Sequence, residues 1–361
     1  MERVAIPTRT NVIREYRERG GSVAAVFPIH YSRALLRAFD FLPVEVWGPP
    51  RVIGGLGEAH LQPYVCSIVR NALSFLQSGG LDVADLLLVP HACDSLQGLG
   101  SLLIDFVSPR QPVLTLYLPR GRRESDTDFL ANEFRTVYHR LETITGRTPS
   151  DADLMACIRR EEGADRLLAE LHRQRQNIPL DDETFYRFIR SREYLPAERF
   201  TPLAQDMLSQ AVETEREGTS FILSGIVPEP MSLFKAISEM GGRVVADDLA
   251  SCGRRLYPAG QSEEPFQRMA EQIVHAPPDP TRGSPIGERL DHLLQLVNTF
   301  GARGVVFYDV KFCEPELFDL PQLRHGLREA GIPSLTVEVD ISDELSQPVQ
   351  NRLAAFLEMI Q

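Results

Sequence analysis

The feature that most constrains the fold is a regular alternation of short apolar runs with helix-patterned segments. In the first part of the chain the apolar runs are VAAVF, VEVW, DLLLVP and PVLTLY, and apolar residues at helical spacing occupy residues 31–39 and 61–76. Strands that alternate with helices are typical of parallel pairing, because a parallel partner requires a long crossover connection. The pattern predicts a doubly wound α/β sheet within residues 21–117.

The same alternation returns after residue 218. Strands are predicted for SFILSG, RVVADD, GVVFYDV and SLTVEVD, and helices for MSLFKAISEMGG, PIGERLDHLLQLVNTFGA, LPQLRHGLREAG and VQNRLAAFLEMI. LDVADLLLVPHACDS with the later QPVLTLYLP can be laid over GARGVVFYDVKFCEP with the later IPSLTVEVD. We therefore expect an α/β protein with two related parallel-sheet domains of Rossmann or flavodoxin type, the alternative being a chance likeness of short α/β units.

Between these two parts lies a charged stretch with helical patterns. Residues 129–144 carry apolar side chains at helical spacing, and Gly146 is expected to end that helix. Ser150 is a suitable N-cap for the next helix, with Asp153 as the acidic partner of a capping box. The expected division is an N-terminal α/β domain at 1–120, an inserted helical segment at 121–217 and a C-terminal α/β domain at 218–361.

Composition and charge exclude several classes of protein. The 361 residues are 43% hydrophobic, enough for a sizeable core without disulfide or metal staples. A formal net charge of −12 disfavours general binding to a phosphate backbone, so we expect no nucleic-acid partner. No apolar run approaches the about 20 residues of a membrane span. The charged start MERVAIPTRTNVIREYRERG lacks an apolar signal core, so we expect a cytoplasmic protein without a membrane partner.

Several common functional motifs are absent from the sequence. It contains no C-x-x-C pair, which disfavours a zinc ribbon or an electron-carrier ferredoxin. It contains neither a G-x-x-x-x-G-K-[ST] loop nor a G-x-G-x-x-G fingerprint, so nucleotide hydrolysis and classical-type dinucleotide binding have no support. A G-x-S-x-G nucleophile elbow is also absent.

The cysteines are the remaining candidates for chemistry. Their number, five, is odd and their spacing is wide, so we expect reduced thiols or metal ligands rather than a disulfide framework. Cys93 and Cys313 each follow an apolar strand by three residues, at the sheet edge where ligands bind and near a helix N-terminus that favours a thiolate. Cys66 is expected in the first turns of a helix that begins near residue 61, Cys252 after a strand, and Cys157 within a helix. Composition alone favours a small buried structural residue at any one of these positions, and the matched strand-end positions of Cys93 and Cys313 leave a structural role and a ligand role equally open.

The segments around the cysteines resemble the subunits of the 2-hydroxyacyl-CoA dehydratase and class I benzoyl-CoA reductase family, in particular the smaller, D-component-like subunit. The resemblance covers nearly the whole chain and rests on the order and spacing of its segments. They are FPIHYSRALLRAFDFLPVEVWG, LQPYVCSIVRNAL, LLLVPHACDSLQGL, YLPRG with FLANEFRTVYHRLETITG, SFILSG with GGRVVADDLASCGRR, GVVFYDVKFCEPE, GIPSLTVEVD and NRLAAFLEM.

This resemblance implies that Cys66, Cys93 and Cys313 hold a [4Fe-4S] cluster with one iron that no protein thiolate binds. It implies oxygen-sensitive radical chemistry on an acyl-CoA, either dehydration of a 2-hydroxyacyl-CoA (a lyase reaction) or ring reduction of an aromatic acyl-CoA (an oxidoreductase reaction) in anaerobic metabolism. The implied partners are a second cluster-bearing subunit, or a second copy of this chain in a dimer, and an ATP-dependent activator protein that supplies the electron.

The opening segment departs from the family pattern. Ser32 stands where the family has a proline, Ala34 where it has a glutamate and Asp40 where it has a glycine. The missing glutamate puts an ordinary dehydratase site in doubt. His30 and Ser32, at the end of the first strand, are the candidate catalytic residues, and the alternative is a surface histidine with an N-cap serine.

Other roles stay open from the sequence. Cys252 lies where the family often has a cysteine but is not expected as a ligand. Arg254 and Arg255 beside it are candidates for contact with CoA phosphates, although a solvated basic pair is the favoured interpretation. The alternatives for function are a non-catalytic or electron-relay cluster subunit, a homodimeric reductase of another small molecule, and an iron-free ligand-binding protein with two lobes.

Overall fold

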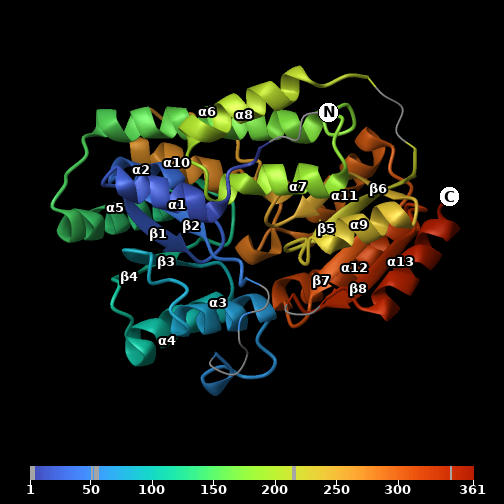
Figure 1. Cartoon of the computed structure of the whole chain (residues 1–361), viewed down its shortest axis with the longest axis horizontal. Coiled ribbons are helices and arrows are strands. Elements are labelled where there is room, and N and C mark those ends of the chain that lie inside the picture. The colour runs from blue at the N-terminus through green and yellow to red at the C-terminus, as the bar shows by residue number, and fades with distance from the viewer. Residues whose placement is uncertain (1–4, 50–51, 53–56, 214–216, 342–343) are drawn as a thin grey trace.

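Two parallel sheets of four strands each form the centre of the fold, one in each half of the chain (Figure 1). The computed structural model describes residues 5–49, 52, 57–213, 217–341 and 344–361. The N-terminal sheet consists of β1 (Ser22–Val26), β2 (Phe41–Glu45), β3 (Leu86–His91) and β4 (Val113–Tyr117). The C-terminal sheet consists of β5 (Thr219–Gly225), β6 (Gly242–Leu249), β7 (Val305–Val310) and β8 (Ser334–Val339).

Both sheets have the same topology. Their strand orders are β2-β1-β3-β4 and β6-β5-β7-β8, and all neighbouring strands are parallel. Ser22 of β1 lies beside Phe41 of β2, and Val305 of β7 beside Ser334 of β8. The central strands β5 and β7 are buried at every residue, because helices cover both faces of the sheet. The expected α/β fold with two related parallel sheets is therefore confirmed.

Helices surround the sheets. The N-terminal half contributes α1 (Arg9–Glu18), α2 (Arg33–Ala38), α3 (Ser67–Gln77) and α4 (Asp94–Leu102). The C-terminal half contributes α9 (Ser232–Glu239), α10 (Pro265–Val274), α11 (Ile286–Phe300), α12 (Glu314–Glu329) and α13 (Gln347–Met359). Within the described residues, no helix has both the length and the apolar character that crossing a lipid bilayer would require.

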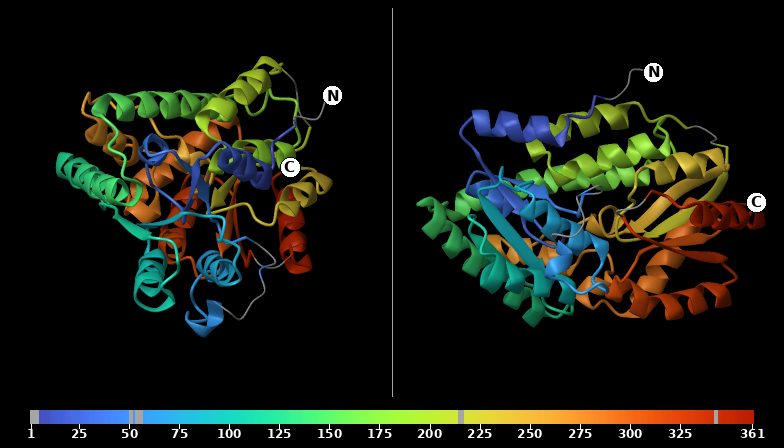
Figure 2. Two further views of the ribbon diagram at one scale, coloured as in Figure 1. Left: turned by 60° about the vertical axis from the view of Figure 1, so that its left-hand side comes forward. Right: turned by 60° about the horizontal axis from the view of Figure 1, so that its bottom comes forward.

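The middle stretch is helical, as expected, and it ties the two halves together. It forms α5 (Glu124–Thr145), α6 (Asp151–Arg173), α7 (Asp182–Arg190) and α8 (Ala197–Ser209), which Figures 1 and 2 show in green along both halves. Tyr186 of α7 stacks on Phe234 of α9, with ring centroids 4.3 Å apart. Tyr138 of α5 packs edge-on against Phe266 of α10 at 5.6 Å. The halves therefore share packed side chains and do not touch through a linker alone.

The predicted caps of this stretch are confirmed. Gly146 ends α5 in the left-handed conformation, with φ of 67°, which glycine adopts without a side-chain clash. Ser150 accepts a hydrogen bond from the backbone N–H of Asp153, whose carboxylate accepts from the Ser150 N–H in return, so the capping box forms as predicted.

Several predicted boundaries are wrong. The helix predicted at 61–76 begins only at Ser67, since Gln62 precedes a proline and is disfavoured from helical conformation. The second strand ends at Glu45, two residues before the predicted end. Helix α12 begins before the predicted segment LPQLRHGLREAG, with Pro315 in its first turn and Pro321 inside it. Helices α1 and α10 have no counterpart among the predicted elements, and Met1–Val4 at the charged start lie outside the described residues.

Candidate metal centre

Three of the five cysteines occupy the same local position, the N-cap of a helix. Cys66 precedes α3, Cys93 precedes α4 and Cys313 precedes α12. The N–H groups of a first helical turn have no partner within the helix and carry a partial positive charge, which favours an anionic sulfur. The expectation that Cys93 and Cys313 lie at helix N-termini is confirmed, whereas Cys66 precedes its helix rather than lying within its first turns.

The fold brings these three thiols together. Cys66 and Cys313 are buried members of one apolar cluster, and the partly buried Cys93 packs against it. Each pair among the three sulfurs lies close enough to interact electrostatically. Cys93 follows β3 and Cys313 follows β7, the equivalent strands of the two sheets, so the site uses the carboxyl edges of both. In Figure 1, α3 and α4 lie along the lower edge of the N-terminal half and α12 along that of the C-terminal half.

Burial keeps these thiols protonated in the metal-free chain. Burial raises the pKa of Cys66, raises that of Cys93 to about 12, and raises that of Cys313 well above its ordinary value. Negative charge on neighbouring thiolates adds to the rise for Cys93 and Cys313, while first-turn N–H groups oppose it. A bound cation would reverse this balance, because a thiolate that ligates a metal is deprotonated outright.

The spacing of the three sulfurs does not suit a single ion. Within the described residues, no group of three or more His, Cys, Asp or Glu side chains is set closely enough to hold one metal ion. A polynuclear iron–sulfur cluster differs, because each thiolate binds a different iron and the ligands stand farther apart.

A cavity of ≈ 220 Å³ opens beside Cys93, the one of the three cysteines that lines it. Its wall includes Cys93, Arg120, Thr281, Glu314 and Phe318, so both halves of the chain contribute to it. The side chain of Arg120 is 69% exposed, and its guanidinium lies 3.7 Å from Asp94. The cavity thus brings together the ring of Phe318, the hydroxyl of Thr281 and the exposed guanidinium of Arg120 beside Cys93.

The other two cysteines lie elsewhere. Cys252 is buried in the core of the C-terminal sheet, with its sulfur 3.4 Å from the hydroxyl of Ser251. Cys157 is half-buried in α6, where it packs against the core of the N-terminal sheet. Neither belongs to the apolar cluster that holds Cys66, Cys93 and Cys313.

His30 lies behind the wall of this cavity, and Ser32 lies at the start of α2. His30 is fully buried, so the surface interpretation is wrong; its Nε2 lies 3.1 Å from the hydroxyl of Thr281 and its Nδ1 3.3 Å from that of Tyr257. Ser32 is the N-cap of α2, as the alternative interpretation held, and accepts from the backbone N–H of Leu35. His30 therefore reaches the cavity only through Thr281, one of its wall residues.

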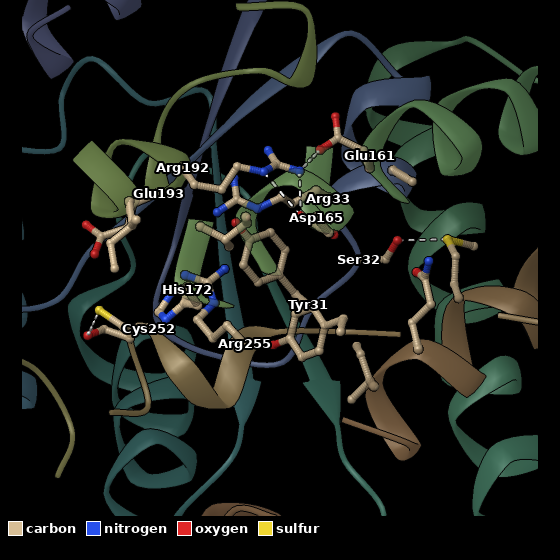
Figure 3. A pocket seen from close by; sticks show the side chains of 18 residues that line it. Tyr31, Ser32, Arg33, Glu161, Asp165, His172, Arg192, Glu193, Cys252 and Arg255 are labelled. Carbon is tan, nitrogen blue, oxygen red and sulfur yellow. Dashed lines mark hydrogen bonds and ion pairs between the residues drawn. The ribbon is translucent and has the colours of Figure 1, made fainter. Parts of the chain in front are cut away.

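Ser32 also lines a second, enclosed cavity, shown in Figure 3. Its volume is only ≈ 30 Å³, enough for a water molecule or two and far too small for an organic substrate. Arg192 spans part of its wall in ion pairs with Glu161 and Asp165. This polar cavity is therefore too small to be the substrate site.

Arg254 and Arg255 are not a solvated basic pair. Both are buried, at 0% and 7% exposure, and their guanidinium groups are held by carboxylates, which removes them as exposed contacts for CoA phosphates. Arg255 donates to both oxygens of Glu45, at 2.5 and 2.6 Å, across the junction between the two halves. Arg33 also donates to Glu45. Burial opposes ionisation of Glu45, but Arg255 and Arg33 outweigh it and lower the pKa of that carboxyl to about 2.

The buried imidazole gives a prediction for acid stability. Burial lowers the pKa of His30 from 6.5 to about 4, against the opposing effect of Asp279. His30 therefore takes up a proton near pH 6.5 in the unfolded chain but only near pH 4 in the folded chain. The free energy of unfolding should fall by about 3 kcal/mol as the pH drops through this window, because the unfolded chain binds the proton more tightly. Urea unfolding at pH 7 and pH 4 measures the effect.

The variant His30→Asn should remove that part of the pH dependence, since asparagine does not titrate and tolerates the φ of 64° at this position. His139→Asn, at an exposed position on α5, is the matched control and should keep the wild-type slope. An unchanged slope in His30→Asn would contradict the assignment.

Known proteins of similar sequence agree with this geometry. Residues 28–360 match the family model described as 2-hydroxyglutaryl-CoA dehydratase, D-component. The chain is 23% identical to the (R)-phenyllactyl-CoA dehydratase beta subunit of Clostridium sporogenes, over 97% of this chain and 94% of that one. It is 24% identical to the beta subunit of lactoyl-CoA dehydratase of Anaerotignum propionicum (95% and 93% covered) and 25% identical to a benzoyl-CoA reductase subunit of Thauera aromatica (96% and 94%).

These relatives are named as subunits of lyases and of an oxidoreductase that act on acyl-CoA thioesters. The match begins just after β1 and extends over the other strands of both sheets and the helices between them, so it includes all three helices that begin after a cysteine. The chain therefore belongs to the 2-hydroxyglutaryl-CoA dehydratase D-component family of enzyme subunits.

Proposed function

We propose that this chain is the smaller, [4Fe-4S]-binding subunit of an oxygen-sensitive radical enzyme that acts on an acyl-CoA thioester. Cys66, Cys93 and Cys313 would hold the cluster. The observation that carries this proposal is the convergence of three cysteine-capped helix N-termini on one buried site. Family membership supports the acyl-CoA substrate class.

The residues present fit such a cluster. The site offers three thiols, and the remaining cysteines of the chain lie in other cores, so a fourth thiolate from this chain is not at hand. One iron would then keep a coordination position for a non-protein ligand. When bound, a cluster of this kind supplies one-electron transfer at a very negative potential, down to about −700 mV.

The side chains of this chain prepare the site for that chemistry. The apolar cluster around Cys66 and Cys313 excludes water from the thiolates. Arg120, which is mostly exposed at the cavity wall, would meet an anionic group of CoA, and the hydroxyl of Thr281 would face the thioester end. His30 would act by holding Thr281 in place, and Ser32 by capping α2, so neither would touch the substrate directly.

The proposed partners are a second cluster-bearing subunit, or a second copy of this chain, and an ATP-dependent activator. The three relatives above are all named as subunits, and this chain has Ala34 where the family carries a glutamate. A partner would supply the missing catalytic group across a contact above about 1,000 Å². The same alanine favours the second candidate function, an electron-relay subunit that holds the cluster without completing the active site.

Anaerobic reconstitution tests the proposal. After incubation with iron, sulfide and a thiol, we expect about four irons and four sulfides per chain, the content of one [4Fe-4S] cluster. The matched control is the same protein treated in air, which should lose the cluster. Less than one iron per chain under anaerobic conditions would contradict the proposal and leave an iron-free ligand-binding protein.

Turnover then separates the two candidate functions. The reconstituted chain, its partner subunit and an activator would be offered a panel of 2-hydroxyacyl-CoA and aromatic acyl-CoA thioesters. ATP-dependent consumption of a thioester is expected of a catalytic subunit. A loaded cluster with no turnover on the whole panel would favour the electron relay or a reductase of another small molecule.

A further inference from the structure

A buried network of charged side chains lies behind the helix that carries Cys313. Arg254, from the short helix η4 (Gly253–Arg255), donates two hydrogen bonds to the carboxylate of Asp248, from Nε at 2.8 Å and from Nη2 at 3.0 Å. Its Nη1 donates to Glu316 at 2.5 Å, and Arg289 of α11 donates to the second oxygen of Glu316 at 2.5 Å. All four side chains are at most 2% exposed. Arg289 also donates to Asp319, one turn farther along α12, at 3.2 Å.

Such a network is not a source of stability in itself. The free energy lost when charged groups leave water is about as large as the free energy gained from their mutual attraction. Well-packed apolar residues in the same place would often give a fold of equal stability. The network also offers nothing to a ligand, because its hydrogen-bonding groups are enclosed and directed at one another. What it does specify is geometry: it fixes the end of β6, α11 and the first turn of α12 relative to one another.

Glu316 connects this network to the thiol. Its carboxylate lies between Arg254 and Arg289, and its backbone N–H stands at the third position of α12, whose N-cap is Cys313. A small rotation of the first turn would therefore change the distance between this N–H and the Cys313 sulfur. Hydrogen bonds to cluster sulfurs are among the main determinants of an iron–sulfur potential.

The Cys93 helix has no comparable support. Asp94, the first residue of α4, is 79% exposed and its only ion pair among the described residues is the 3.7 Å contact with Arg120. The residue of α4 equivalent to Glu316 is Leu96, which is buried in the apolar cluster. The two equivalent strand ends thus support their cysteines differently, one through a charged network and one through an apolar side chain.

We infer that Glu316, held by Arg254 and Arg289, is a positioning residue that aims the first turn of α12 at the Cys313 sulfur. The inference rests on the proposed cluster and concerns its affinity and potential. Partners that orient a metal ligand from outside its coordination shell commonly change metal affinity by about 10- to 100-fold when they are removed.

The test compares Glu316→Ala with Glu316→Gln in the reconstituted full chain. Both variants lack the negative charge, but the glutamine amide oxygen can still accept from one of the two arginines and hold the turn in part, although its NH2 group cannot accept from the other. The difference between the variants therefore isolates position from charge. We expect Glu316→Ala to bind iron about 10- to 100-fold more weakly in competition with a chelator, whereas Glu316→Gln should lose clearly less. The midpoint potential of Glu316→Ala should lie below that of Glu316→Gln, because a weaker N–H contact stabilises added negative charge less.

Glu161→Ala and Glu161→Gln are the matched controls. Glu161 is a buried carboxylate paired with Arg192, but it lies on α6, away from the three cysteine-capped helices. These controls should lower thermal stability without altering iron affinity or potential. Equal affinity and potential in Glu316→Ala and Glu316→Gln, or an equal loss of affinity in Glu161→Ala, would overturn the inference. If wild type itself binds no cluster, the proposed function fails instead, so the two failures are distinguishable.

Discussion

Alanine at Cys66, Cys93 or Cys313 is expected to abolish a stable cluster, and with it all turnover, in three separate variants. Each substitution leaves two thiolates for a cluster that needs three, and water cannot replace the lost ligand in an apolar wall. Iron and sulfide counts after anaerobic reconstitution, with the visible absorption of the cluster, measure the loss.

Cys252→Ala is the matched control for burial, since Cys252 is as enclosed as the proposed ligands but lies in another core. Cys157→Ala is the control for a partly exposed thiol. Both should keep the wild-type iron content. Loss of iron in Cys157→Ala together with retention in Cys93→Ala would show that the ligand assignment is wrong.

Glu45→Ala should destabilise the fold by about 3 to 5 kcal/mol, because it leaves Arg33 and Arg255 buried without their shared carboxylate. Trp47 and Tyr31 also lose an acceptor, at 2.9 Å each. Because Arg255 comes from the C-terminal half, the loss falls on the junction between the halves. Urea unfolding at pH 7 measures it.

The control is Glu239→Ala, which breaks an exposed pair with Lys235 and should change stability by less than about 1 kcal/mol. Acid gives an independent check. The pKa of Glu45 is lowered from 4.5 to about 2, so its stabilising effect is complete above pH 4.5 and is lost as the pH falls through 2. Glu45→Ala should lack this loss, and a variant no less stable than Glu239→Ala would contradict the role of Glu45.

The strands could be predicted from the sequence because each is a continuous apolar run. Such runs, when they alternate with helical segments, are typical of the buried strands of a parallel sheet. The missed helices carry weaker signals. Helix α1 is too polar to show a clear apolar stripe, whereas α10 begins with Glu264 as N-cap and Pro265 at its first position, which is a recognisable helix start. The domain limits at 120 and 217 stay a prediction.

The site was only partly predictable. The strand-end positions of Cys93 and Cys313 follow from local pattern, but nothing local shows that Arg255 meets Glu45, 210 residues away, or that His30 meets Thr281, 251 residues away. One signal was available: Glu45 is a charged residue inside an apolar strand, which predicts a buried partner. The position of Glu316, one turn after Cys313, was likewise visible in the sequence, though its arginine partners were not.

The three cysteine-capped helices have a consequence for the order of biosynthesis. Cys313 follows Cys93 by 220 residues and lies just after β7, a strand of the second sheet. At typical translation rates of about 5 to 20 residues per second, a ribosome needs about 10 to 40 s to make that interval. During this time the first two cysteines are already outside the tunnel without their third partner. A cluster held by all three can therefore be inserted only after the segment that carries Cys313 has been made and folded. Its insertion would be a late step that acts on a chain whose first sheet has already formed.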